Sequence, residues 1–262
     1  MPPSTVTVWA TNTGVGKTLV SAGLAAVARR GPLYRNVLYI KPVQTGYPDD
    51  SDGAHVANVG GGTYEAMPHA AAAGIVSKPP ASIPREGGGL LCRTIFAWKR
   101  AVGPHLAAAS EGRAVSDDEL VAAVRDAAGW ARSDRALALV ETAGGVASPA
   151  PSGTLQHDVY ASLGLPALLV GDGALGGISA TLCAHEALAR RGHAVAAVAL
   201  LDGGLRNEEA IRDNLPAETP VVVLPPIRPE DTAAEWVYGA AEGPLRELLH
   251  CVAPEESSRS AS

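Results

Sequence analysis

The chain has 262 residues, of which 47% are hydrophobic and 18% are charged, and its net charge is −6. This composition is typical of a globular protein and excludes wholesale disorder, while the length suits one α/β domain or at most two small ones. The acidic balance does not suggest a nucleic-acid-binding surface, although it leaves room for a local basic pocket that binds phosphate.

Short apolar, β-rich runs alternate with longer helical patterns along the chain. Several of the runs are apolar on both faces, as expected of strands buried in a parallel sheet. The alternation predicts a sheet with helices on both faces and ligands beyond the carboxyl ends of its strands. In chain order, the predicted elements are strand 5–9, helix 17–30, strand 37–43, helices 94–109 and 117–132, strands 136–140 and 167–170, helix 178–191, strands 195–201 and 221–224, and helix 233–249.

Two segments depart from this rhythm. Residues 53–90 are rich in Gly, Ala and Pro and are predicted to form a long loop over the site or a flexible insertion, whereas 253–262 resemble a disordered tail. We expect a single domain over 1–252. No apolar run approaches the roughly 18 residues that span a bilayer, and the first strand leaves no room for a signal peptide. Three widely spaced cysteines favour a reducing compartment, so a soluble intracellular protein without visible targeting segment is expected.

The loop between the first predicted strand and helix reads ATNTGVGKT over residues 10–18. Its glycines let several backbone N–H groups face one anion beside the positive end of a helix. Thr11 occupies the first glycine position of a strict GxxxxGK(S/T) pattern, so an ordinary glycine-containing turn is the alternative; GVGKT in this context nevertheless predicts a nucleotide site. The predicted nucleotide-binding residues here are Asn12, Gly14, Val15, Gly16, Lys17 and Thr18. Among them, Lys17 would reach the β- and γ-phosphates and Thr18 would bind Mg²⁺.

Two further clusters end predicted strands. Lys41 ends an apolar run and is followed by Pro42, which fixes the turn, so its ammonium should face the ligand crevice. Glu141 ends the third strand, where an acidic residue beside a phosphate loop commonly binds magnesium or its water. A helix N-cap or a structural ion pair are the alternatives for Glu141. Together these features predict a P-loop NTPase-like (Rossmann-like) three-layer α/β sandwich with a mostly parallel central sheet.

The three segments resemble dethiobiotin synthetase, and the similarity extends over residues 5–250. It is carried by IKPVQTG at 40–46, the acidic DSD at 50–52 and ETAGGVASP at 141–149. Residues 152–179 are also similar to the synthetase half of eukaryotic bifunctional proteins, in which an aminotransferase follows in the same chain. A mitochondrial location follows if the chain is of that eukaryotic type, and a cytoplasmic one otherwise.

The resemblance implies an ATP- and Mg²⁺-dependent enzyme that joins CO₂ to 7,8-diaminopelargonate and closes a ureido ring through a carbamate and a carbamic–phosphoric anhydride. Phosphoryl transfer to a carbamate is mainly a problem of positioning and charge stabilisation. The implied catalytic residues are Thr13, Lys17, Lys41 and Thr45; the metal ligands are Thr18, Asp52 and Glu141; Thr45, Gly144, Gly145 and Val146 contact the substrate; and Leu224, Pro225 and Pro226 border the adenine.

The family is homodimeric, and a helix start of the other subunit binds the far carboxylate of the substrate. Gly177, Ile178 and Ser179 match that helix start, whose free N–H groups suit a carboxylate; a glycine-rich turn is the alternative. Neither a membrane nor a nucleic acid is an expected partner.

Two other functions remain open from the sequence: another P-loop ATP-dependent amidoligase, or a non-catalytic nucleotide-binding regulatory domain. The histidines form no metal-spaced pair, and Arg93, Trp98, Lys99 and Arg100 are interpreted as one exposed helix face.

Overall fold

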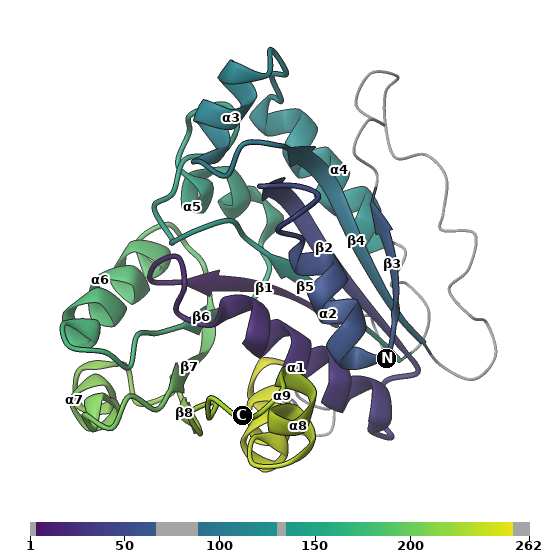
Figure 1. Cartoon of the computed structure of the whole chain (residues 1–262). Helices are drawn as coiled ribbons and strands as arrows, with labels where there is room; N and C mark the ends of the chain where they lie inside the picture. Colours follow the sequence, from purple (N-terminus) through teal and green to yellow (C-terminus); the bar gives the residue numbers. More distant parts are fainter. Residues whose placement is uncertain (1–3, 67–88, 130–134, 254–262) are drawn as a thin grey trace.

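The computed structural model describes residues 4–66, 89–129 and 135–253, and one parallel β-sheet runs through them (Figure 1). Within these residues the strand order is β3-β4-β2-β5-β1-β6-β7-β8, and each pair of neighbours is parallel. The strands are β1 (Ser4–Ala10), β2 (Asn36–Thr45), β3 (Thr63–Ala66), β4 (Gly89–Trp98), β5 (Ala136–Glu141), β6 (Ala167–Val170), β7 (Val195–Leu201) and β8 (Val221–Leu224).

Helices cover both faces of the sheet (Figure 1), which gives the three layers predicted. Val8 and Leu139 face one apolar cluster, which is closed by α1, α2, α8 and α9. Trp9 and Val140 face the other cluster, which is closed by α3 to α7. The helices are α1 (Lys17–Arg30), α2 (Asp52–Gly60), α3 (Pro104–Ser110), α4 (Asp117–Gly129), α5 (Gln156–Val159) with the 3-10 turn η2 (Tyr160–Leu163), α6 (Gly177–Ala189), α7 (Asn207–Asn214), α8 (Ala233–Tyr238) and α9 (Glu242–Val252).

The prediction of a helix over 94–109 is wrong, because the chain stays extended in β4 to Trp98 and turns helical only in α3. The exposed-face interpretation fails with it. Arg93 is 3% exposed and Trp98 is 1% exposed, and only Lys99 and Arg100, which follow the strand, are exposed. Arg93 is buried because its guanidinium donates to a Glu65 carboxylate oxygen at 2.7 Å, so the charge that suggests an exposed position is paired across neighbouring strands.

Other predicted boundaries also shift. The segment 53–90 is not one loop, since it contains most of α2, all of β3 and the first two residues of β4. Residues 67–88 of this segment lie outside the described residues. The predicted helix 233–249 is interrupted at Gly239, which separates α8 from α9. Helix α7 was not predicted. Of the predicted tail 253–262, only Ala253 belongs to the described residues, and it is buried.

The order of the strands places the predicted site. Strands β2, β5 and β1 are adjacent and parallel, so the ends of all three lie at one edge of the sheet. Lys41, Glu141 and the loop after Ala10 therefore meet near that edge. The turn predicted at Pro42 is absent, because β2 continues through Pro42 to Thr45 and pairs there with β4. Among the described residues, no helix has the length and apolar character that a membrane span requires.

Candidate phosphate- and metal-binding site

The β1–α1 loop has the backbone of an anion-binding turn. Gly14 and Gly16 have φ angles of 81° and 91°, in the left-handed region that glycine adopts without strain. Gly16 is the N-cap of α1 and no side chain caps the helix, so the first helical N–H groups are open to an anion. A Cβ on Gly16 would also overlap the side chain of Leu201 at the end of β7. Glycine is therefore required here by the backbone conformation, and any other residue would also displace the end of the Leu201 side chain.

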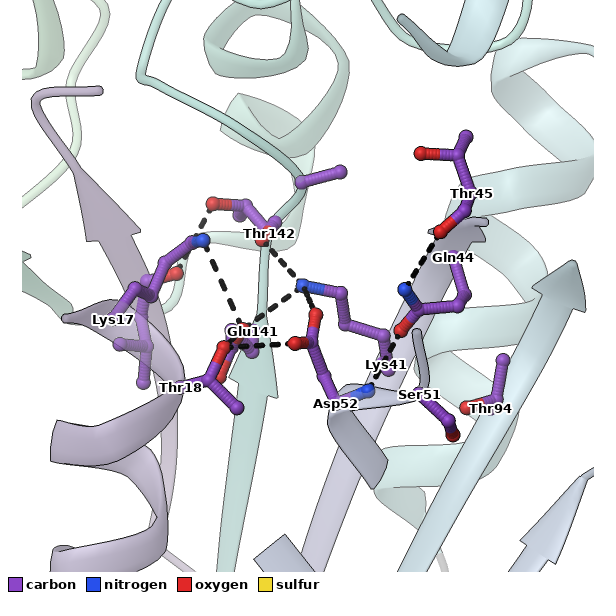
Figure 2. Close-up of polar contacts among 12 residues, drawn as sticks. Lys17, Thr18, Lys41, Gln44, Thr45, Ser51, Asp52, Thr94, Glu141 and Thr142 are labelled. Carbon is purple, nitrogen blue, oxygen red and sulfur yellow. Dashed lines mark hydrogen bonds and ion pairs between the residues drawn. The ribbon is translucent and has the colours of Figure 1, made fainter. Parts of the chain in front are cut away.

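Five charged or hydroxyl side chains converge beside this loop, as Figure 2 shows: Lys17, Thr18, Lys41, Asp52 and Glu141. The Thr18 hydroxyl lies 2.9 Å from Asp52 Oδ1 and 3.0 Å from Glu141 Oε1. The Lys41 ammonium lies 2.6 Å from Asp52 Oδ2 and 2.9 Å from Glu141 Oε1, and it also donates to the Thr142 carbonyl. The three predicted metal ligands and a predicted catalytic lysine thus form one hydrogen-bonded cluster.

The two lysines of the cluster differ electrostatically. Burial opposes the charged form of Lys41, but Glu141 and Asp52 outweigh burial and raise the pKa of Lys41 above its ordinary value. Burial and the neighbouring Lys41 lower the pKa of Lys17, whose ammonium lies 3.8 Å from Glu141 Oε1. Burial favours neutral Asp52, yet Lys41 lowers the pKa of this carboxyl. Lys17 is therefore the cation that gains more from an incoming polyanion.

The donor set fits a hard divalent cation. In nucleotide sites Mg²⁺ is bound by one or two carboxylates, a hydroxyl, waters and phosphate oxygens. Asp52 and Glu141 supply the carboxylates and Thr18 supplies the hydroxyl. The fully buried Glu141 carboxylate contacts Thr18, both lysines and the Tyr39 hydroxyl among the described residues. Across those residues no cluster of three His, Cys, Asp or Glu side chains suits a metal, so Mg²⁺ would depend on the hydroxyl and on the nucleotide.

A cleft of about 720 Å³ opens in front of the cluster. Of the predicted substrate-binding residues, Thr45 and Gly144 line it; Thr13 also lines it, opposite Gly144. The N–H groups of Gly145 and Val146 are already engaged, because they donate to Ser148 Oγ and to the Ala10 carbonyl, both at 2.9 Å. These two residues therefore support the wall of the cleft, and Gly144 is the one of the three that faces it.

Gly145 is required by its close approach to the phosphate loop. A Cβ there would lie 2.7 Å from the Thr11 carbonyl oxygen and 3.3 Å from Asn12 Cα. We expect Gly145→Ala to lower the free energy of unfolding by about 1–3 kcal/mol, measured by denaturant titration. Gly243→Ala is the matched control, since a Cβ within α9 meets nothing within 4 Å; it should be neutral or stabilising by about 0.5 kcal/mol. Equal stability of the two variants would contradict the close approach.

The predicted base pocket lies where β7 and β8 end. The Asp202 N–H donates to the Leu224 carbonyl at 2.8 Å, and the Pro225 carbonyl accepts from Trp236 Nε1 at 2.9 Å. The Leu224 side chain is fully buried in the core, so this residue can offer only its backbone to a base. Pro225 is half-buried and Pro226 is exposed. Both remain available as an apolar wall.

Helix α6 begins at Gly177, as the sequence indicated, after Gly176 in the left-handed region. The loop that leads from β6 into α6 is held by Asn207, whose Nδ2 donates to the carbonyls of Asp172 at 3.2 Å and Ala174 at 2.9 Å. The predicted carboxylate-binding residues Gly177, Ile178 and Ser179 form its first turn. They are not among the residues that line the cleft.

Sequence reasoning missed several residues of the site. Gln44 lines the cleft and is 4% exposed; its signal was an uncharged polar side chain at the end of a buried strand. Residues 101–104, which were assigned to a helix, form another wall. Ser148 both lines the cleft and accepts from Gly145. No local pattern identifies residues 101–104, because the course of the chain after β4 brings them to the site.

Comparisons with known proteins agree on a family. A family model described as an AAA domain matches residues 4–83 and 91–233. A bifunctional dethiobiotin synthetase/7,8-diamino-pelargonic acid aminotransferase of Oryza sativa subsp. japonica, named mitochondrial, is 44% identical over 87% of this chain and 32% of its own length. The ATP-dependent dethiobiotin synthetase BioD of Caulobacter vibrioides is 35% identical over 72% of this chain and 75% of its own length. The chain thus spans about a third of the bifunctional relative and most of the bacterial one.

Solved structures are similar in fold. The MinC:MinD cell division protein complex of Aquifex aeolicus matches with a TM-score of 0.53 and 14% identity over 94% of this chain and 96% of that one. A ParA family ATPase of Chlorobium tepidum matches with a TM-score of 0.51 and 12% identity over 96% and 93%. At such identities the likeness concerns the fold alone, and it confirms the predicted P-loop NTPase-like class.

Proposed function

This chain belongs to the dethiobiotin synthetase family, and from that premise we propose that it uses ATP and Mg²⁺ to join CO₂ to 7,8-diaminopelargonate and close the ureido ring of dethiobiotin. The observation that carries the proposal is the convergence of Lys17, Thr18, Lys41, Asp52 and Glu141 beside the phosphate loop. A degenerate nucleotide-binding domain has no need of this complete set, and its presence favours an enzyme over a regulatory domain.

The nucleotide phosphates bind at the start of α1. The open N–H groups after Gly16 face the phosphates, and Lys17, whose charge is the less well paired of the two lysines, moves onto their oxygens. Thr18, Asp52 and Glu141 would hold Mg²⁺. When bound, the ion neutralises charge that develops on the transferred phosphoryl group.

The acceptor is the carbamate that forms when CO₂ adds to one amine of the substrate. Its carboxylate is a poor electrophile until a phosphoryl group from ATP converts one oxygen into a leaving group. Lys41 stays protonated, since its pKa is raised, and it pairs with the carbamate and the transferred phosphoryl together. Thr45 and Thr13, which line the same cleft, donate hydrogen bonds to the two reacting groups. The second amine then attacks the anhydride carbon and expels phosphate, which closes the ring.

A second copy of the chain completes the substrate site in this proposal. The first turn of α6 is open to an anion, and its neighbour Leu175 is 94% exposed, an apolar side chain suited to burial in a dimer. The far carboxylate of the substrate, held at the cleft of one protomer, would bind the N–H groups of Ile178 and Ser179 of its partner. The Gly177 N–H already donates to the Ala174 carbonyl at 2.9 Å.

The reaction is tested by phosphate release from ATP with Mg²⁺, bicarbonate and 7,8-diaminopelargonate. We expect release that depends on the diamine, together with a cyclic urea product identified by mass spectrometry. A control without diamine defines the background hydrolysis. Nucleotide binding without diamine-dependent phosphate would contradict the proposal and favour a different amidoligase or a regulatory domain.

A further inference from the structure

The side chain of Gln44 joins the end of β2 to the start of α2. It is 4% exposed. Its Oε1 accepts from the Asp52 N–H at 3.1 Å, and its Nε2 donates to the Thr45 carbonyl at 2.9 Å (Figure 2). The orientation of the amide is fixed by chemistry, because a backbone N–H only donates and a carbonyl only accepts. Both halves of a buried amide are thus committed to two residues of the proposed site.

The accepted N–H belongs to the first residue of α2. A helix leaves its first N–H groups without partners inside the helix, and here two side chains take them up. Ser51, the N-cap, accepts from the Ala54 N–H at 3.4 Å. Gln44 takes the N–H of Asp52 itself. The Ser51 contact is local to the helix, whereas the Gln44 contact fixes the helix start to the strand that also carries Lys41.

That connection determines where the Asp52 carboxylate lies. Its two oxygens are 2.9 Å from the Thr18 hydroxyl and 2.6 Å from the Lys41 ammonium, so a small displacement of the helix start breaks both contacts. An amide makes the connection without charge. A carboxylate at position 44 would accept from the same N–H but could not donate to Thr45.

We propose that Gln44 is a positioning residue, which holds the Asp52 backbone so that its carboxylate stays in place to bind the Mg²⁺ of the nucleotide complex. This rests on the proposed nucleotide and Mg²⁺ site, and it does not depend on the identity of the acceptor substrate. Residues that orient a metal ligand typically change metal affinity by about 10–100-fold when they are replaced. The effect of losing Gln44 is therefore confined to the metal-dependent part of nucleotide binding.

The test is calorimetric titration of the full chain with ADP, with and without Mg²⁺. Gln44→Met retains an unbranched apolar side chain of similar length but loses both hydrogen bonds. We expect the affinity gained from Mg²⁺ to fall by about 10-fold or more, while binding of ADP alone is unchanged. The proposal is overturned if Mg²⁺ increases the ADP affinity of Gln44→Met as much as that of wild type. It is also overturned if the variant loses the same ADP affinity with and without Mg²⁺.

Gln156→Met is the matched control, because Gln156 is also a buried glutamine whose amide accepts from and donates to the backbone beside the cleft. Its Oε1 accepts from the Ala143 N–H at 3.0 Å and its Nε2 donates to the Ala143 carbonyl at 2.6 Å, and neither hydrogen bond involves Asp52 or helix α2. We expect its metal-dependent gain to match wild type. In an Asp52→Asn background, Gln44→Met should cause no further loss; a further loss would show that Gln44 does not act through Asp52. Absence of diamine-dependent phosphate release would leave these titrations unaffected.

Discussion

Replacement of Lys41 by glutamine is expected to lower turnover by about 10³-fold, the scale seen when an electrostatic donor to a developing charge is removed. The ammonium is buried and is held protonated by Glu141 and Asp52. In the proposed reaction it is the group that pairs with the carbamate and the phosphoryl group together. A neutral amide can donate a hydrogen bond there but cannot balance the charge.

The same substitution is expected to spare nucleotide binding. The phosphate loop and Lys17 remain, and two carboxylates that lose a cation attract Mg²⁺ more strongly. We therefore expect ADP with Mg²⁺ to bind Lys41→Gln at least as tightly as wild type in calorimetry, while diamine-dependent phosphate release disappears. Lys99→Gln, at an exposed position, is the control and should behave as wild type. Full activity in Lys41→Gln would refute the proposed role of this lysine.

The central sheet could be predicted because its strands are fully buried. Residues 6–10 of β1 and all residues of β5 and β6 are less than 3% exposed, and nearly all of them are apolar or small. Such short, wholly apolar runs indicate strands of a parallel sheet that is covered on both faces. Strand β4 was misassigned because Arg93 and Thr94 interrupt its apolar run. Their partners are Glu65 and Tyr64, which lie in β3. Such pairing is a tertiary contact, which cannot be predicted from the residues adjacent in sequence.

The site divides in the same way. Lys17, Thr18, Lys41 and Glu141 could be placed because their positions relative to recognisable strands are local. Glu141 ends β5, Lys41 lies in the second half of β2, and Lys17 and Thr18 begin the helix that follows β1, so parallel strands bring them to one edge. Asp52 was placed by the family resemblance, but the helix that presents it was not predicted, although Ser51 caps it and Gly61 ends it in the left-handed region. The position of a residue along a strand can be predicted from the neighbouring sequence. The hydrogen bond from the Asp52 N–H to Gln44 depends on how α2 packs against β2, which the neighbouring sequence does not determine.

Glu141→Gln provides the second test, because its effect on the metal should be opposite to that of Lys41→Gln. The cluster holds two lysines and two carboxylates, Lys17 and Lys41 against Asp52 and Glu141, so its charges balance. Removing Lys41 leaves one excess negative charge and removing Glu141 leaves one excess positive charge. Glu141 is fully buried, so loss of its charge also leaves the lysines under-compensated, and unfolding free energy should fall by about 3 kcal/mol.

Both variants should therefore lack turnover, yet they should respond to Mg²⁺ in opposite directions. We expect Mg²⁺ to strengthen ADP binding to Lys41→Gln and to give little or no gain for Glu141→Gln, since an ion cannot replace a missing carboxylate ligand beside two ammonium groups. Thermal unfolding with ADP, with and without Mg²⁺, measures this for both proteins, and Glu119→Gln on an exposed turn of α4 controls for loss of charge alone. A metal-dependent shift of Glu141→Gln as large as that of wild type would remove Glu141 from the metal site and leave it as a structural partner of Lys41.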